Sequence, residues 1–138
     1  AQLKTAGVDL QTETVAFPAA LEAAGKGEHN LAPMTFSSSD PSVLALTYLS
    51  SNADGGFNWS KIHDPELDRL LKAGVQTLDP AQRADLYAQA QARIMDLALV
   101  LPIRDYVNLN AAKATVQGLQ YDLRGWFPWL HDVYLQSK

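Results

Sequence analysis

The sequence predicts an α/β fold, a small mixed sheet flanked by helices, from the order of its apolar patterns. A half-buried strand is indicated where every second residue is apolar or β-branched, at Val8, Leu10, Thr12 and Thr14. An amphipathic helix is expected next, because apolar residues recur at helical spacing over residues 17–24. The apolar run 31–36 then has the length of a buried strand. Since the connections are short, this order favours a right-handed parallel crossover.

Three further helices are expected to begin at Asp-Pro pairs, which are Asp40-Pro41, Asp64-Pro65 and Asp79-Pro80. The aspartate can accept hydrogen bonds from the free N–H groups of the first turn, and proline suits the first helical position. The second helix should bury one face, formed by Leu67, Leu70, Leu71, Val75 and Leu78. The third should be long and bury Tyr87, Ala90, Ile94, Leu97 and Leu101.

The last part of the chain is expected to return to extended structure. Val107, Leu109 and Ala111 alternate with polar residues, and Gly118 indicates a turn. The end is rich in aromatic residues, among them Trp126, Phe127 and Trp129.

The composition is that of one globular domain over residues 1–138, with 47% hydrophobic and 19% charged residues. The net charge is −4 and the basic residues are scattered, which argues against nucleic-acid and membrane-surface binding. There is no cysteine, so disulfides and thiolate chemistry are excluded. The opening AQLKTAG reads as the last turn of a helix, so we expect a fragment or an excised domain.

Catalytic and metal-binding patterns are not found in the sequence. His29, His63 and His131 have no ligand-like spacing, so neither a metal site nor a cofactor is expected. The serine run Ser37–Ser39 could supply a nucleophile on an α/β scaffold. A serine hydrolase therefore stays open as an alternative, although the run has no nearby base.

Four stretches in order give the chain a family resemblance. They are AGVDLQTETVAFPAALEAAGKGEHNLAPMTFSS, FNWSKIHDPELDRLLKAG, TLDPAQRADLYAQAQARIMDLALVLPI and VQGLQYDLRGWFPWLHDVYL. They resemble the C-terminal part of the extracytoplasmic solute-binding proteins of ABC importers, in the dipeptide, oligopeptide and nickel class. Together the four stretches cover nearly the whole chain.

The resemblance implies one lobe of a two-lobed clamshell of the periplasmic-binding-protein type (type II), with the N-terminal lobe and the hinge absent. It implies capture of a peptide or other small polar solute in the periplasm or cell envelope, without catalysis and without a membrane span. The ligand would pass to the permease of an ABC importer. A lipid anchor and a cleaved leader both remain open, as does a solute-sensing scaffold with the same fold.

The expected ligand contacts come from three segments. The loop after the apolar run 31–36 offers Ser37, Ser38 and Ser39, and the carboxyl end of a strand is where ligands bind in open α/β sheets. Oligopeptide-binding members carry G-W-x-A-D-Y here, and its aspartate pairs with the peptide amine. Phe36 takes the place of the tryptophan and Ser39 that of the aspartate, so amine anchoring is in doubt.

The second segment is FNWSK, in which Asn58 and Trp59 are expected to form a wall of the cleft and Phe57 to enter the core. The third segment, Arg104, Asp105 and Tyr106, is a polar cluster that either faces the cleft or forms a surface ion pair. Trp126, Phe127 and Trp129 are expected to pack the tail onto the lobe or to cover the surface that the first lobe contacts.

Overall fold

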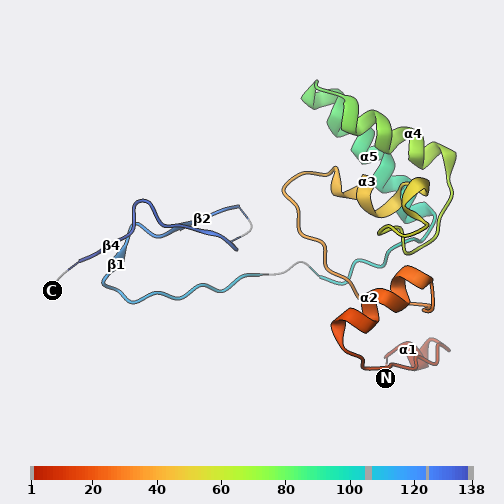
Figure 1. Ribbon diagram of the computed structural model, residues 1–138, viewed down its shortest axis with the longest axis horizontal. Coiled ribbons are helices and arrows are strands. Elements are labelled where there is room, and N and C mark those ends of the chain that lie inside the picture. The colour runs from red at the N-terminus through yellow and green to blue at the C-terminus, as the bar shows by residue number, and fades with distance from the viewer. Residues whose placement is uncertain (1, 105–106, 124, 137–138) are drawn as a thin grey trace.

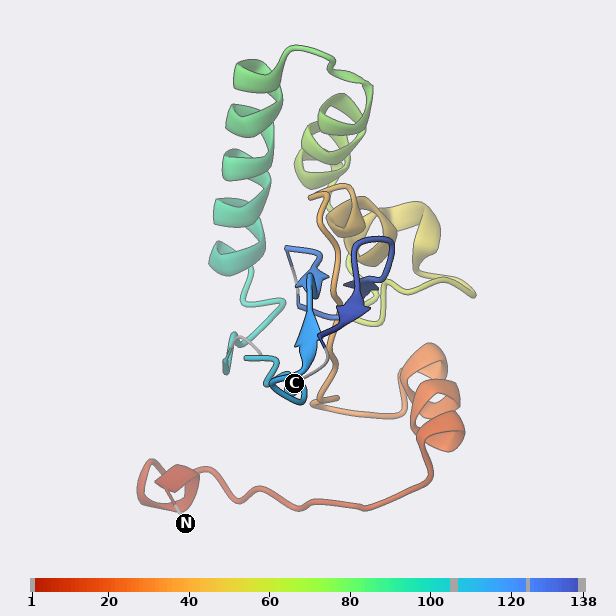
Figure 2. The ribbon, with the colours of Figure 1, turned by 90° about the vertical axis from the view of Figure 1, so that its left-hand side faces the viewer.

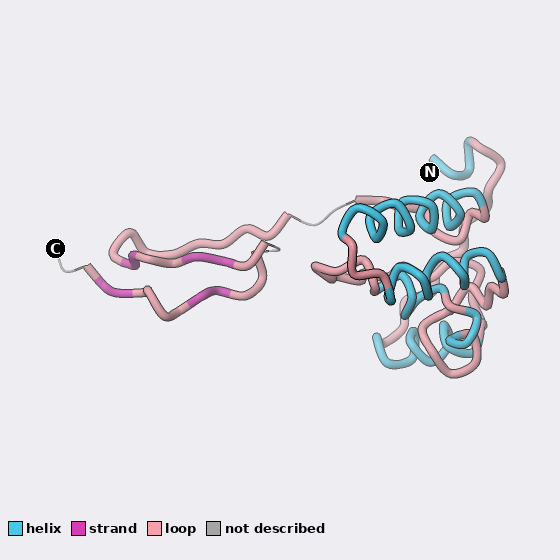
Figure 3. Tube along the Cα trace, turned by 90° about the horizontal axis from the view of Figure 1, so that it is seen from above, coloured by secondary structure: helices cyan, strands magenta, loops and turns pink. Residues whose placement is uncertain are grey.

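The computed structural model describes residues 2–104, 107–123 and 125–136. It has a helical body, residues 17–99, and a C-terminal arm, residues 107–136, that reaches away from that body (Figures 1 and 3). The helices are α1 (Gln2–Thr5), α2 (Phe17–Lys26), α3 (Val43–Tyr48), the 3-10 turn η1 (Ser50–Asn52), α4 (Pro65–Gln76) and α5 (Pro80–Asp96). The strands are β1 (Val116–Gln117), β2 (Gln120–Tyr121), β3 (Pro128–Trp129) and β4 (Tyr134–Leu135).

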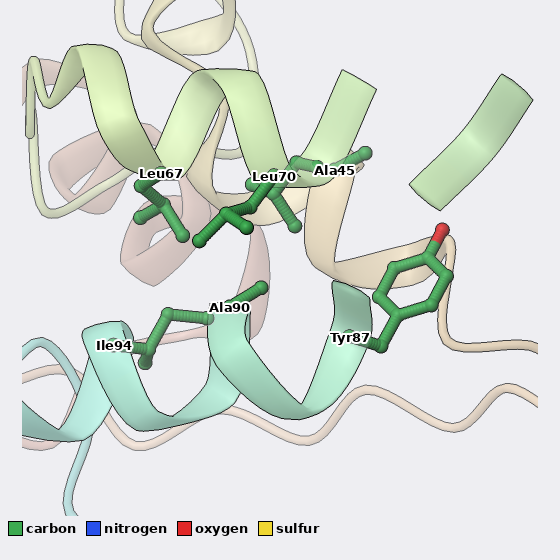
Figure 4. Close-up of a cluster of buried hydrophobic side chains, with 7 residues drawn as sticks. Ala45, Leu67, Leu70, Tyr87, Ala90 and Ile94 are labelled. Atoms are coloured by element: carbon green, nitrogen blue, oxygen red, sulfur yellow. The ribbon is translucent and has the colours of Figure 1, made fainter. Parts of the chain in front are cut away.

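The core of the helical body lies between α4 and α5, which run side by side, with α3 packed against α4 (Figures 1 and 2). Figure 4 shows the α4 leucines directed towards Ala90 and Ile94 of α5. The buried cluster contains Ala45, Leu67, Leu70, Leu71, Tyr87, Ala90 and Ile94. Within the described parts of the chain, every buried residue lies between Ala24 and Ile94.

The Asp-Pro pairs begin helices as expected for α4 and α5. Asp64 accepts the N–H of Leu67 at 2.7 Å, and Asp79 accepts the N–H of Gln82 at 2.8 Å. The first pair differs, because α3 begins only at Val43. Asp40 instead accepts the N–H of Ser42 at 2.8 Å, a local turn that precedes the helix.

The expected faces of these helices are confirmed in their central turns and wrong at their ends. Val75 is 52% exposed and Leu78 is 95% exposed, because α4 ends at Gln76 and the chain then turns into α5. Helix α5 ends at Asp96, which leaves Leu97 as its C-cap and places Leu101 outside the helix, 72% exposed. The periodic apolar pattern therefore continues past the last helical turn at both sites.

The three long strands expected at 8–14, 31–36 and 107–111 are not formed in the structure. Their backbones are irregular or extended, and Leu10, Leu31 and Leu109 are exposed. A strand needs a neighbour for its backbone N–H and C=O groups, and none of the described strands is paired with these segments. The α/β class holds in the coarser sense of helices with small sheets, whereas the expected parallel crossover is absent from the part of the chain described.

The sheets belong to the C-terminal arm, where β1 pairs with β4 and β2 pairs with β3, both antiparallel. Val116 lies opposite Leu135, and Gln120 lies opposite Trp129. Two residues separate β1 from β2, whereas four separate β3 from β4, so the ladder is interrupted between the two pairs. Gly118 lies at that interruption with φ of +74°, as expected of a turn glycine. The arm exposes large apolar side chains, among them Leu109, Leu123, Phe127, Leu130 and Leu135.

Candidate functional site

Three aromatic rings form a cluster on the surface of the helical body. The ring centroids of Phe36 and Phe57 lie 5.9 Å apart, those of Phe36 and Trp59 lie 6.0 Å apart, and those of Phe57 and Trp59 lie 5.7 Å apart. We call Phe36, Phe57 and Trp59 the aromatic cluster. Phe36 is 42% exposed and Phe57 is 43% exposed, so the expectation that Phe57 enters the core is wrong. The structure thus brings together two segments that the sequence analysis singled out separately.

The serine loop, Ser37–Ser39, follows Phe36 directly and is exposed. The hydroxyl of Ser38 donates to the carbonyl oxygen of Asp40 at 2.9 Å and accepts the N–H of Asp40 at 3.1 Å. Ser38 therefore shapes the loop, while Ser37 and Ser39 are exposed and follow Phe36 in the chain. An exposed hydroxyl next to an apolar ring offers a ligand both polar and apolar contact.

Asn58 lies between two members of the aromatic cluster but is fully buried. Its side-chain amide donates to the carbonyl oxygens of Leu49 at 3.1 Å and Ile62 at 2.9 Å. Its carbonyl oxygen accepts from the hydroxyl of Ser60 at 2.8 Å and from the N–H of Ile62 at 3.3 Å. These bonds use both donors and both acceptor positions of the amide. Asn58 therefore supports the loop that carries Trp59, and its side chain is not exposed on the surface of the helical body.

Lys61 ties the same loop to α2, a role that the sequence did not indicate. Its ammonium group donates to the carbonyl oxygen of Gly25 at 2.6 Å, and also to that of Ala53. Lys61 adopts a positive φ of 52°, unusual for a residue with a side chain. The carbonyl of Gly25 belongs to the last turn of α2, where a cation interacts favourably with the helix dipole.

Two ion pairs hold the segments that lead from the aromatic cluster into the helices. Arg83 lies 2.8 Å from Asp40, and Arg93 lies 2.6 Å from Asp64. The hydrogen bond from Arg83, assisted by Ser42, holds the pKa of Asp40 well below its usual range. The hydrogen bond from Arg93, followed by that from the N–H of Leu67, lowers the pKa of Asp64. Both carboxylates are therefore charged at neutral pH.

The third expected segment is described only in part. Arg104 is exposed, whereas Asp105 and Tyr106 lie outside the described residues. The aromatic residues of the tail belong to the C-terminal arm, whose backbone reaches away from the helical body (Figure 1), so the tail is not packed onto that body. Trp126 is 46% exposed and Trp129 is 50% exposed. An open hollow of about 290 Å³ in the arm is lined by Asn108, Leu109, Asn110, Gly125, Trp126 and Phe127.

Over residues 2–104, 107–123 and 125–136, no three histidine, aspartate or glutamate side chains gather closely enough to hold a metal ion. Among the helices in those same ranges, none is long and apolar enough to cross a membrane.

The chain is similar over most of its length to bacterial peptide-binding proteins, which confirms the resemblance to solute-binding proteins of the peptide class. It is 30% identical over 123 residues to the probable di/tripeptide-binding protein 5 of Pseudomonas aeruginosa, covering 87% of this chain and 23% of that protein. It is also 30% identical over 121 residues to di/tripeptide-binding protein 4 of the same organism, covering 86% and 23%.

A third relative is the periplasmic oligopeptide-binding protein OppA of Salmonella typhimurium, 25% identical over 117 residues, covering 83% of this chain and 21% of that protein. The chain therefore spans less than a quarter of the length of the curated relatives it matches. No protein-family profile matches the chain. No solved structure matches it significantly.

Proposed function

We propose that the chain is one lobe of a two-lobed protein that captures a short peptide or other small polar solute outside the cytoplasmic membrane. The ligand would then be handed to the permease of an ABC importer, with no chemical change. The observation that carries the proposal is the similarity to three peptide-binding proteins over 83–87% of this chain. Closure of two lobes around a ligand is driven by the ligand's contacts with both of them.

The proposed ligand surface on this lobe is the outer face of the aromatic cluster and the serine loop. Phe36 and Trp59 supply rigid apolar area, and Ser37 and Ser39 supply hydroxyl groups at its edge. Ser38 and Asn58 support the surface without contacting the ligand, because their polar atoms are hydrogen-bonded to backbone carbonyl oxygens. Arg104, Asp105 and Tyr106 stay in the proposal as a polar side of the cleft.

The class of ligand follows from the neutral hydroxyl groups of the serine loop, which adjoins the aromatic cluster. Ser39 occupies the place where the resemblance puts an amine-anchoring aspartate, and a hydroxyl group cannot neutralise an ammonium group as a carboxylate can. Ligand selection on this lobe therefore rests on apolar side chains and neutral hydrogen-bonding groups. Peptides with bulky apolar side chains suit the aromatic cluster better than peptides of glycine or alanine.

The alternative of a serine hydrolase draws no support from the loop geometry. The hydroxyl proton of Ser38 is donated to the carbonyl oxygen of Asp40, and the carboxylate of Asp40 is engaged with Ser42 and Arg83. All three relatives carry the names of binding proteins. A serine-directed fluorophosphonate probe is expected to leave Ser37, Ser38 and Ser39 unlabelled.

The test is thermal unfolding of a two-lobed protein that contains this chain, with tri-leucine, tri-alanine and a panel of other small solutes. A ligand that binds only the folded state adds stability, about 2.7 kcal/mol at one hundred times its Kd. We expect tri-leucine to raise the Tm more than tri-alanine, and Trp59→Ala to reduce that rise. The variant Leu78→Ala is the matched control, because Leu78 is exposed and lies outside the proposed surface. If every solute leaves the Tm unchanged, solute capture is contradicted.

A further inference from the structure

Helix α5 reaches both segments that form the proposed ligand surface through two arginines. Arg83 lies in its first turn and Arg93 in its last turn, about 15 Å apart at the rise of an α-helix. Each arginine forms an ion pair with the aspartate at the C-terminal end of one of these segments. Asp40 follows Phe36 and the serine loop, and Asp64 follows the loop of Phe57 and Trp59.

The guanidinium group of Arg83 is fixed on three sides. Its Nη2 donates to Oδ1 of Asp40 at 2.8 Å, and its Nε donates to the carbonyl oxygen of Gly74 at 3.1 Å. Its Cζ atom lies over the ring of Tyr87, 5.0 Å from the ring centroid. The same oxygen of Asp40 accepts the N–H of Ser42. A lysine would offer a single charged group and could not make the planar contacts.

The contact of Arg93 with Asp64 is made by two nitrogens. Nη2 lies 2.6 Å from Oδ2, and Nε lies 3.4 Å from Oδ1. The Asp64 side chain is only 12% exposed and also caps α4 through the N–H of Leu67. Asp64 is therefore held from the α4 side and from the α5 side at once.

We propose that Arg83 and Arg93 are positioning residues, through which α5 sets the distance between the serine loop and the Trp59 loop. The inference rests on the proposed function, because it assigns these arginines to the ligand surface described there. Neither arginine is part of the surface itself; each acts through its aspartate. The buried leucines of α4 and Ala90 and Ile94 of α5 pack without them, so loss of either ion pair should displace a loop and leave the core in place.

The first experiment needs no ligand and uses the 138-residue chain. Hydrogen–deuterium exchange is compared for Arg83→Gln, Arg93→Gln and the control Arg69→Gln, whose exposed ion pair with Glu66 lies elsewhere on α4. We expect Arg83→Gln to speed exchange at the amides of Asp40 and Ser42 by about tenfold, because local opening sets the rate. Arg93→Gln should do the same at Asn58 and Lys61. Equal exchange in all three variants would overturn the proposal.

The second experiment measures the Kd for tri-leucine in the two-lobed protein. Arg83→Gln and Arg83→Lys should each weaken binding by about tenfold while the ligand-free protein keeps its helical circular dichroism, and Arg69→Gln should have no effect. The double variant Asp40→Asn with Arg83→Gln should bind no more weakly than Arg83→Gln alone, because both residues act through one contact. Additive losses, or faster exchange with an unchanged Kd, would overturn the positioning role. If the wild type binds no solute, solute capture fails, and the exchange result still decides whether the arginines hold the loops.

Discussion

The rings of Phe36 and Trp59 lie with their centroids 6.0 Å apart and their planes at 43°, although they come from separate loops. Phe57 contacts both rings, edge-on to Phe36 and tilted against Trp59. Each loop is thereby ordered by the other, and the apolar surface between them depends on both.

The variant Phe36→Ala is expected to destabilise the chain by about 1 kcal/mol, since aromatic pairs contribute roughly 0.5–1.5 kcal/mol beyond their buried area. The loss is modest because the ring is 42% exposed. Urea unfolding measures it, with Leu78→Ala as a control that removes an exposed side chain without ring contacts. Equal stabilities of the two variants would show that the aromatic cluster contributes nothing to folding.

The variant Asn58→Ala is expected to cost about 1–3 kcal/mol, because it leaves the carbonyl oxygens of Leu49 and Ile62 without their donors in a buried position. Asn58→Asp should cost more, since a carboxylate would face the same two oxygens. Chemical denaturation gives both values, and the exposed Asn30→Ala serves as the matched control. A loss from Asn58→Ala no larger than that of the control would contradict the supporting role of Asn58.

The variant Gly118→Ala is expected to break the pairing of β1 with β4. A Cβ on Gly118 would lie 2.0 Å from the carbonyl oxygen of Asp132. That oxygen belongs to the backbone, so the clash can be relieved only if the chain itself moves. Gly7→Ala is the control, because Gly7 has a similar positive φ of 81° but open space around it. Amide exchange at Gln136, whose N–H donates to Thr115 across the ladder, should speed up in Gly118→Ala alone. Unchanged exchange at Gln136 would show that β1 and β4 are not paired as described.

Acid should destabilise the chain below about pH 4. The pKa values of Asp40 and Asp64 are lowered by their arginines, so each carboxylate binds its proton more weakly in the folded state than in the unfolded state. Their contribution is complete above the unfolded value of about 3.9 and is lost as the pH falls through the folded value. Urea unfolding from pH 7 to pH 2 should show a decline at the acid end. Asp64→Asn should make that decline shallower, and an unchanged slope would refute the assignment.

The sequence predicted the helices well because each carries its own local signals. Asp64-Pro65 and Asp79-Pro80 mark starts, and the spacing of Leu67, Leu70 and Leu71 marks the buried face. Helical hydrogen bonds close within one segment, so local pattern is sufficient. Strands need partners elsewhere in the chain, which is why the alternation of Val8 and Leu10 could indicate a strand without forming one among the described residues.

The candidate site was predictable in its residue types and not in their roles. Phe36 and Trp59 were expected on one surface and do meet, but the same stretch also suggested Asn58 as a ligand contact and Phe57 as core. Only the path of the backbone decides which of three consecutive side chains faces inward. The arginines were visible in the sequence, yet their partners Asp40 and Asp64 lie 43 and 29 residues away, and no local pattern pairs them.

The distribution of buried residues has a practical consequence for spectroscopy of this chain. Trp59 sits on the helical body, whereas Trp126 and Trp129 sit on the C-terminal arm, where no described residue is buried. Far-ultraviolet circular dichroism therefore reports mostly on the helices, and two of the three indoles report on the arm. The two signals should change at different denaturant concentrations, and a shared midpoint would mean that arm and body melt as a single cooperative unit.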